Sequence, residues 1–526
     1  MRDFQKPGRS AVYARNGMCA TSHPLAAAVA VDLLKQGGSA VDAALGAAAI
    51  LSLCEPPMTG FGGDCFALVK SAGTEEIIGL NASGRGPAGL DAAAIRAEGH
   101  SVMPVTSAHA VTLPGAVSGF LALSERFGRM DLAEVFAPAI RYADEGVPVA
   151  PRVALDMGLS TDRLQGFARR DYLKDGRALR AGELFRAPGQ GEVLRRIVRD
   201  GHAGFYQGEV AEDMVNALRA AGGSHTLEDF AGVQPEWTTP ISGGYRGLEI
   251  VEHQPNGQGT AALLLAAILE RFDLASMDPW GPERTHIEAE ATKLAYDARD
   301  RFVTDPDHMD PVTRLQAEGL ADKLAALIAP DRVMPDAARI SEEVHRDTVY
   351  LTVVDKDRMA VSLIYSIFNS FGSGIGTEKF GLLMHNRGAG FSITEGHPNE
   401  AAPGKRPMHT ILPGMIRQEG RLLMPFGVMG GQYQAAGHAR FASNIADYGL
   451  DPQSALDAPR AFASEGVLEL ETGYPEATRA ALLKLGHKVT VPDRPIGGAQ
   501  AIRLNDGGDV LEGASDPRKD GMALGY

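Results

Sequence analysis

Two pairs of residues carry groups that are used in catalysis. One pair has a threonine hydroxyl, and the other has the backbone N–H groups of two glycines. Asp347-Thr348 opens the β-branched and apolar run DTVYLTVVDKD, and Gly430-Gly431 follows another apolar run. A threonine hydroxyl becomes a nucleophile once a base takes its proton, and glycines let backbone N–H groups point at a developing oxyanion. Each feature alone is ordinary, because threonine favours strands and paired glycines favour turns.

The elements that would position these residues follow from the hydrophobic pattern. From about residue 348, two β-branched runs joined by Asp-Lys-Asp-Arg predict a β-hairpin, and the C-terminal third continues as strands. Apolar residues at three- and four-residue spacing predict that the middle of the chain is mostly helical. Near the start, Ser22 is predicted to cap a helix with Pro24 in its first turn, and Ser39 and Asp42 have capping-box spacing. Strands covered by helices from both ends of the chain predict a layered sandwich.

Composition narrows the class of protein. The 526 residues are 44% hydrophobic and 22% charged, which is typical of a globular protein. The net charge of −15 disfavours nucleic acid or an anionic membrane as a partner. The three cysteines lack C-x-x-C spacing, so neither a disulfide framework nor a structural zinc site is indicated. The N-terminal residues lack the apolar segment of a secretory signal, and no apolar run is long enough for a membrane helix, so we expect a cytoplasmic protein.

Several common catalytic motifs are absent from the sequence. It has no G-x-x-x-x-G-K-[ST], no H-E-x-x-H and no G-x-S-x-G. His286-Ile287-Glu288 has the H-x-E spacing of zinc deaminases, but no P-C-x-x-C follows, which favours a structural histidine. The glycine-rich run from Gly372 to Gly376 lacks the next glycine of a phosphate loop and favours a turn. We therefore expect no metal and no organic cofactor.

Eight runs, in order over almost the whole chain, resemble the γ-glutamyltransferase family. They are GGSAVDAALGAA (from Gly37), EPPMTGFGGDCFAL (from Glu55), VTLPGAVSGF (from Val111), DTVYLTVVDKD (from Asp347), FGSGIG (from Phe371), HNRGAGFS (from His385), PGKRPMHTILP (from Pro403) and GVMGGQ (from Gly427). Members of that family are N-terminal nucleophile hydrolases. The resemblance therefore implies an α+β fold, a four-layer αββα sandwich formed jointly by two chains after self-cleavage.

The resemblance also implies where the chain is cut and which residue attacks. Cleavage between Asp347 and Thr348 would leave a large subunit, 1–347, mostly helical with strands completing the sandwich, and a small subunit, 348–526. Thr348 would be the nucleophile, and its freed α-amine, with a pKa of about 7.7–8.0, would be the base. Ser366 matches the hydroxyl residue that supports the nucleophile. Gly430 and Gly431 match the glycine pair of the oxyanion hole.

The sequence departs from the family where a substrate carboxylate is bound. The position of the carboxylate-binding arginine is Ser83, and Arg85 stands two residues later. The position of the adjacent serine pair is occupied by His409 and Thr410. Because arginine binds carboxylates bidentately, Arg85 is a candidate to hold an anionic substrate.

The sequence also departs where an α-ammonium group is bound. The family's aspartate position is Gly390, and the neighbouring amide positions are Arg387 and Phe368. Loss of a carboxylate and gain of an arginine disfavour an ammonium group. Arg387 is thus a second candidate to hold a substrate carboxylate, beside His409 and Thr410.

Three functions remain open on these residues. The first resembles the branch of the family that contains oxamate amidohydrolase: hydrolysis of the C–N bond of a small anionic amide through an acyl-enzyme on Thr348. The second is a γ-glutamyltransferase or glutathione hydrolase acting on γ-glutamyl amides. The third is an inactive relic with a binding role. In the first two cases the expected partner is a small-molecule amide, the two subunits stay associated, and a dimer of such pairs is left open.

Overall fold

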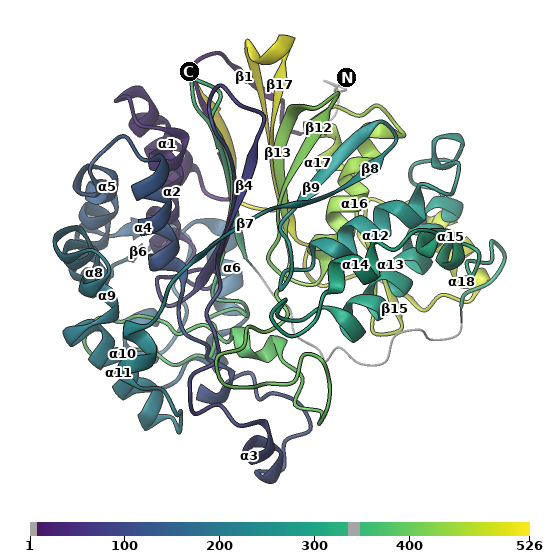
Figure 1. Ribbon diagram of the computed structural model, residues 1–526. Coiled ribbons are helices and arrows are strands. Elements are labelled where there is room, and N and C mark those ends of the chain that lie inside the picture. The colour runs from purple at the N-terminus through teal and green to yellow at the C-terminus, as the bar shows by residue number, and fades with distance from the viewer. Residues whose placement is uncertain (1–7, 335–347) are drawn as a thin grey trace.

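The computed structural model describes residues 8–334 and 348–526. Two seven-stranded sheets lie face to face in the middle of the molecule, and helices cover the outer face of each (Figure 1). Separate hydrophobic clusters lie between each sheet and its helices and between the two sheets. The layers are therefore helix, sheet, sheet and helix, which confirms the predicted αββα sandwich.

One sheet places the predicted hairpin at its centre. Its strands, in spatial order, are β19 (Met522–Gly525), β2 (Met18–Thr21), β10 (Val349–Val354), β11 (Ala360–Ser366), β3 (Asp64–Lys70), β4 (Ile77–Ala82) and β7 (Glu236–Thr238). The hairpin is the antiparallel pair β10–β11, as predicted. Every residue of β10, β11 and β3 is buried, because one face packs on helices and the other on the second sheet.

The second sheet is antiparallel throughout its described strands. In spatial order they are β1 (Val12–Ala14), β18 (Val510–Ser515), β17 (Gly498–Asn505), β13 (Arg421–Met429), β12 (Pro413–Gln418), β9 (Leu248–Glu252) and β8 (Ile241–Tyr245). Gly427 of β13 faces Tyr350 of β10, and a Cβ at Gly427 would lie 2.3 Å from the tyrosine ring. The missing side chain lets the two sheets approach closely at this point. Two smaller sheets pair β5 (Val147–Pro148) with β6 (Leu184–Phe185), and β14 (Ala461–Ser464) with β15 (Val467–Leu470) and β16 (Val489–Thr490).

Helices from the first half of the chain cover the sheet with the hairpin. They are α1 (Pro24–Lys35), α2 (Ala40–Cys54), α4 (Ala116–Phe127), α5 (Leu132–Glu145), α6 (Pro151–Gly158), α7 (Gly166–Tyr172), α8 (Pro188–Asp200), α9 (Ala203–Tyr206), α10 (Gly208–Ala220) and α11 (Leu227–Ala231), while α3 (Ala92–Ala97) belongs to a smaller cluster. The predicted capping box of Ser39 and Asp42 begins α2, whose 15 residues are all buried. The predicted cap of α1 was wrong: its N-cap is His23, whose Nδ1 accepts the Leu25 N–H at 3.2 Å. Ser22 instead donates its hydroxyl proton to the buried carboxylate of Glu55.

The remaining helices cover the second sheet. They are α12 (Gly259–Leu269), α13 (Pro282–Phe302), α14 (Pro311–Leu315), α15 (Leu320–Ala325), α16 (Tyr433–Ala446), α17 (Pro452–Asp457) and α18 (Glu476–Leu485). Helices α12, α13 and α16 pack on one another and provide most of the apolar core behind β13 and β12. The N-terminus of α16 directly follows β13, so the Gly430-Gly431 pair lies in the turn between them.

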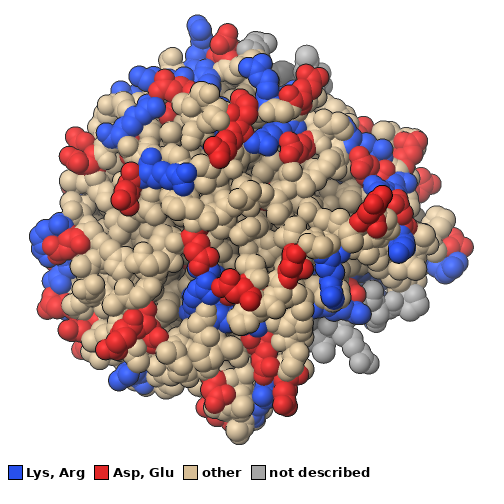
Figure 2. Space-filling model, in the orientation of Figure 1, with Lys and Arg blue, Asp and Glu red and all other residues tan. Residues whose placement is uncertain are grey.

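The surface carries charges of both signs. Figure 2 shows lysine and arginine side chains interspersed with aspartate and glutamate over one face, without a continuous basic area there. Among the described helices, none combines the length and the apolar character needed to cross a membrane.

Candidate active site

Thr348 and Ser366 lie side by side at one end of the hairpin. Thr348 directly precedes β10 and Ser366 ends β11, and the pairing of Val349 with Tyr365 sets the two hydroxyl residues opposite each other. Their hydroxyl oxygens are 3.3 Å apart, and both residues are fully buried. The Phe368 N–H donates to Ser366 Oγ at 2.8 Å, which leaves the serine proton available for Thr348 Oγ1. The predicted cut before Thr348 involves Asp347, which lies outside the described residues.

The glycine pair has a backbone conformation that residues with side chains rarely adopt. Gly430 and Gly431 have φ of +118° and +54°, which glycine adopts readily and other residues rarely do. A Cβ at Gly430 would lie 2.8 Å from Cα of Gly497, so this position has no room for a side chain. No hydrogen bond joins either glycine N–H to a backbone carbonyl of the described loops and turns. Two unsatisfied N–H groups at the start of a helix can bind a negatively charged oxygen.

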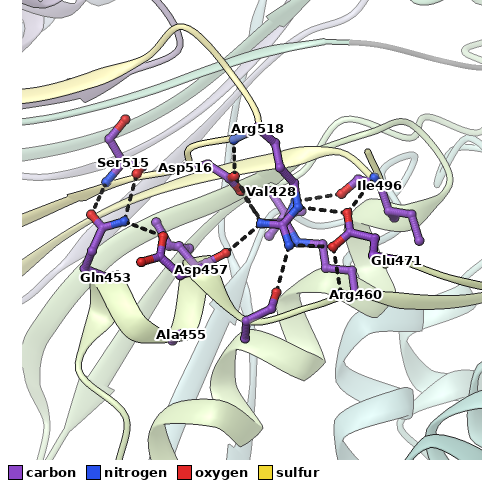
Figure 3. A network of polar contacts seen from close by, with 12 residues as sticks. Val428, Gln453, Ala455, Asp457, Arg460, Glu471, Ile496, Ser515, Asp516 and Arg518 are labelled. Atoms are coloured by element: carbon purple, nitrogen blue, oxygen red, sulfur yellow. Dashed lines mark hydrogen bonds and ion pairs between the residues drawn. The ribbon is translucent and has the colours of Figure 1, made fainter. Parts of the chain in front are cut away.

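A buried polar network holds the segment beside the glycine pair (Figure 3). Arg460 Nη1 donates to the Ile496 carbonyl at 2.6 Å, and Glu471 Oε1 accepts the Ile496 N–H at 2.9 Å. Arg518 connects two carboxylates: its Nε donates to Glu471 Oε1 at 2.8 Å, and its Nη1 donates to Asp516 Oδ1 at 3.2 Å. Burial would raise the pKa of Glu471, but the hydrogen bonds and charge of Arg518 hold it below its usual value. The network therefore stays charged and fixes the chain next to the glycine turn.

A second cluster lies next to Ser366 and is centred on Asp64, the first residue of β3. Asp64 is the register partner of Ser366 across the β11–β3 ladder. Asp64 Oδ2 accepts from Arg387 Nε and from His409 Nε2, each at 2.8 Å, and Oδ1 accepts from Arg387 Nη2 at 3.1 Å. Asp64, Arg387 and His409 have no exposed surface. Both carboxylate oxygens of Asp64 are therefore hydrogen-bonded within the protein.

The charges of this cluster cancel. Burial would raise the pKa of Asp64, but the charge of Arg387 and hydrogen bonds from His385 and His409 hold it well below its usual range. Burial and the nearby Arg387 lower the pKa of His409 to about 3, so its ring is neutral at physiological pH. The hydrogen bonds agree with a neutral ring, since Nε2–H donates to Asp64 while Nδ1 accepts the Ile411 N–H at 3.2 Å. One carboxylate and one guanidinium thus form a neutral pair.

One nitrogen of Arg387 remains directed away from Asp64. Its Nη1 donates to Thr410 Oγ1 at 3.3 Å, and its guanidinium lies 4.1 Å from the ring centre of Phe368. Phe368 has a φ of +76°, an uncommon conformation for a residue with a side chain. The structure thus brings Arg387, His409 and Thr410 together. They lie next to Asp64, which is opposite Ser366 on the neighbouring strand.

Arg85 belongs to a different cluster. Its Nη1 donates to Asp305 at 3.2 Å, and its Nη2 contacts Glu236 at 2.8 Å and Asp307 at 3.2 Å. Its side chain is 32% exposed, and no hydrogen bond or ion pair joins it to Arg387 in the described part of the chain. These contacts favour bracing of a loop, and a role of Arg85 in substrate binding stays a prediction.

Three buried side chains could be considered for a cation. His286 Nδ1 and His487 Nε2 are 2.8 Å apart, and Glu290 offers a carboxylate within 4.8 Å of both. However, Glu290 already pairs with Lys293 at 2.6 Å and accepts the Met334 N–H at 2.6 Å. Lys293 supplies the positive charge that a metal would supply, so we assign no metal to these residues.

Asp64 was missed by the sequence analysis. The signal was present in EPPMTGFGGDCFAL, where a single acidic residue begins an otherwise apolar strand. A charge in a strand that is buried on both faces needs a partner of opposite charge. The sequence could not show that the partner would be Arg387, because 323 residues separate them.

Known proteins match this chain over nearly its whole length. A family model described as "Gamma-glutamyltranspeptidase" matches residues 26–526. The chain belongs to the γ-glutamyltranspeptidase family. It is 34% identical to "Glutathione hydrolase-like YwrD proenzyme" of Bacillus subtilis, over 97% of this chain and 98% of that protein. It is 33% identical to "Oxamate amidohydrolase proenzyme" of Klebsiella pneumoniae, again over 97% and 98%.

The solved structures agree with the family. The crystal structure of a cephalosporin acylase from Bacillus halodurans has a TM-score of 0.92 and 37% identity, and the match covers 100% of this chain and 99% of the other. As a γ-glutamyltranspeptidase family member the chain is an enzyme that acts on amide bonds, and its αββα sandwich is that of the N-terminal nucleophile hydrolases.

Gly390, which the resemblance predicts at the family's ammonium-binding position, has no room for a side chain. A Cβ at Gly390 would lie 2.3 Å from the Met408 carbonyl oxygen, so an aspartate cannot replace this glycine without a backbone shift. The Asn399 side chain also donates to the Gly390 carbonyl at 2.6 Å. The backbone around Gly390 is therefore packed so that only a glycine fits there.

Proposed function

We propose that this protein cleaves itself before Thr348 into chains 1–347 and 348–526 and then hydrolyses a small amide. The acyl group of that amide carries a carboxylate but no α-ammonium group, as in oxamate. The observation that carries the proposal is the saturation of Asp64 by Arg387 and His409 beside the Thr348–Ser366 pair. An ammonium group would find no available carboxylate in this cluster.

The chemistry needs only groups of the protein and water. The freed Thr348 amine takes the Oγ1 proton as Oγ1 attacks the amide carbon, and the oxyanion binds the N–H groups of Gly430 and Gly431. The amine gives the proton to the leaving nitrogen, the C–N bond breaks, and an ester forms on Thr348. Water then attacks the ester with the same amine as base, which releases the acid and restores Thr348.

Arg387 and Thr410 are the groups we propose for the substrate carboxylate. Arg387 keeps Nη1 on the side of Thr410, and both belong to the cluster next to Ser366. A charge-assisted hydrogen bond from Nη1 would hold one carboxylate oxygen, and the Thr410 hydroxyl could donate to the other. Because Thr348 and Arg387 are fully buried in the intact chain, we expect no turnover before cleavage.

The length of the acyl group separates two candidate substrates. The similarity to oxamate amidohydrolase supports a two-carbon acyl group. The similarity to a cephalosporin acylase, at 37% identity over the full chain, supports a longer acyl group as the second candidate. Both fit the neutral ion pair of Asp64 and Arg387, since neither requires a free carboxylate in the site.

Two matched pairs of substrates test the proposal. Glutaryl anilide and γ-glutamyl anilide differ only in the α-ammonium group, and oxamate and oxamide differ only in the carboxylate. We expect wild-type protein, shown by N-terminal sequencing to begin a chain at Thr348, to prefer the first member of at least one pair by tenfold or more. Efficient turnover of γ-glutamyl anilide alone would contradict the proposal in favour of a glutathione hydrolase. No turnover of any of the four would indicate an inactive relic.

A further inference from the structure

Two buried polar residues, Gln258 and Arg299, hold the glycine turn. Gln258 lies just before α12, and Arg299 lies in the last turn of α13. We infer that Gln258 and Arg299 are positioning residues that align the proposed oxyanion-binding turn with the segment that carries Thr410. The inference rests on the proposed function, since it concerns the same site.

Gln258 joins the two halves of the site with one amide group. Its Nε2 donates to the Thr410 carbonyl at 2.6 Å and to the Gly431 carbonyl at 3.2 Å. The side chain is fully buried, so water does not compete for these contacts. A single NH₂ group thus sets the spacing between the glycine turn and the segment that carries Thr410.

Arg299 orients this amide. Its Nη1 donates to Gln258 Oε1 at 2.9 Å and to Gln432 Oε1 at 2.5 Å, so that the Gln258 NH₂ must face the two carbonyls. Arg299 is itself held by an ion pair with Asp300 at 2.7 Å and lies 4.2 Å from the ring centre of Tyr296. The Tyr296 hydroxyl donates to the Gln432 carbonyl, so α13 contacts the turn at two points.

The contacts fix the peptide planes on both sides of Gly431. The Gly430 carbonyl accepts the Tyr433 N–H at 3.1 Å, which sets the direction of the Gly431 N–H. The Gly431 carbonyl is held by Gln258, and by the Gln434 N–H at 3.3 Å. A glycine has more conformational freedom than other residues, so an oxyanion donor made from glycine needs such external contacts to stay aligned.

Four variants test the inference. Gln258→Met keeps the side-chain volume and removes both donors, while Arg299→Met removes the group that orients the amide. We expect each to lower kcat about ten- to a hundredfold, less than the 10²–10³ of a deleted oxyanion donor, because the glycine N–H groups are misaligned rather than lost. Arg299→Lys, which keeps one charged donor, should lie between Arg299→Met and wild type. The double variant Gln258→Met/Arg299→Met should lose less than the sum of the two single losses, because Arg299 acts in part through Gln258.

The matched control is Gln500→Met. Gln500 in β17 is also fully buried, and its amide has no hydrogen-bond partner in the described part of the molecule. Rates are divided by the amount of chain that begins at Thr348, so that a defect in folding or self-cleavage does not count as a defect in kcat. The control should keep the wild-type rate per processed molecule.

The outcomes separate this inference from the proposed function. A fall in kcat of similar size on every amide that the wild type turns over supports an effect on the oxyanion, which all amides share. Normalised rates of Gln258→Met equal to those of Gln500→Met would overturn the inference and leave the proposed function intact. Additive losses in the double variant would also overturn it, because the two residues would then act separately. A wild-type protein that neither processes itself nor hydrolyses an amide would overturn both.

Discussion

Asp64 places a buried negative charge opposite Ser366 on the neighbouring strand, beside the proposed nucleophile Thr348, and Arg387 neutralises it. Taking two charges out of water costs free energy that good geometry only partly returns, so such a pair is weak evidence for stability. Its position beside Ser366 points instead to the charge of the site. With Asp64 and Arg387 paired and His409 neutral, the site offers directional hydrogen bonds and no excess charge.

Asp64→Asn should destabilise the protein more than the removal of both charges. The single change leaves Arg387 buried without its counter-ion, which typically costs about 3–5 kcal/mol. The double variant Asp64→Asn/Arg387→Met leaves no unpaired charge and should recover part of that loss. Thermal unfolding of both in a Thr348→Ala background, where the chain stays intact, measures the difference. A double variant less stable than Asp64→Asn would contradict this account of the cluster.

Glu55 should make the stability of the protein depend on pH. Burial raises its pKa from 4.5 to about 7, against the charge of Lys519 and the hydrogen bond from Ser22. Because the folded state prefers the protonated form, stability falls as pH rises from about 4.5 through 7, by up to about 3 kcal/mol for a difference of this size. Glu55→Gln should therefore raise the unfolding temperature at pH 8 and not at pH 4. The exposed Glu76→Gln serves as control and should show no such pH dependence.

At the scale of elements, the turn between β13 and α16 carries the proposed oxyanion site. Gly430 and Gly431 directly follow β13, and α16 begins two residues after them. The Arg460–Glu471–Arg518 network holds Ile496, beside Gly497 and the turn, and Gln258 with Arg299 holds the turn itself. The flexibility of the glycines is thus limited by contacts with side chains from other parts of the chain.

Gly430→Ala should abolish most of the activity. Alanine disfavours a φ of +118°, and its Cβ would lie 2.8 Å from Cα of Gly497, so the backbone must shift and carry the N–H with it. We expect kcat to fall by about a hundredfold or more. Gly420→Ala is the matched control, since Gly420 also has a positive φ, +77°, but a Cβ there meets nothing within 4 Å. Kinetics of both variants, normalised to processed chain, measure the difference.

At the scale of the whole molecule, the proposed cut would separate strands that alternate within one sheet. Strand β2 of the large chain lies between β19 and β10 of the small chain, and β3 of the large chain pairs with β11 of the small one. In the second sheet, β1 and β9 of the large chain flank strands of the small chain. Neither chain could leave without breaking ladders inside both sheets.

The two chains should therefore stay together after cleavage. Gel filtration of processed protein is expected to show one species that contains both chains, and a denaturing gel should show two bands. Separation should require a denaturant concentration that also unfolds the sheets, followed by circular dichroism. Free small chain in native buffer would contradict the interleaved topology.

Chelation should leave the activity unchanged. The proposed reaction uses a hydroxyl, an amine and backbone N–H groups, and the His286–His487–Glu290 group already contains the Lys293 ammonium. Dialysis against EDTA followed by assay on the preferred amide tests this. Activity that is lost and then returns with one specific metal would contradict it, and His286→Ala would show whether these histidines hold that metal.

The sequence by itself determined the hairpin, the helical middle of the chain and the family resemblance, because periodicity and motif order are local properties. The resemblance predicted Ser366 as the partner of Thr348, and the register of the hairpin in the structure sets their two hydroxyl groups side by side. The sequence pattern predicted Ser22 as the cap of α1, which was wrong, because the Ser22 hydroxyl is hydrogen-bonded to Glu55, 33 residues later in the chain. Tertiary structure alone decided the charge of the site. Arg387 and Arg85 look alike in sequence, but the fold pairs one with Asp64 beside the nucleophile and the other with carboxylates of a separate cluster, over separations that no local pattern records.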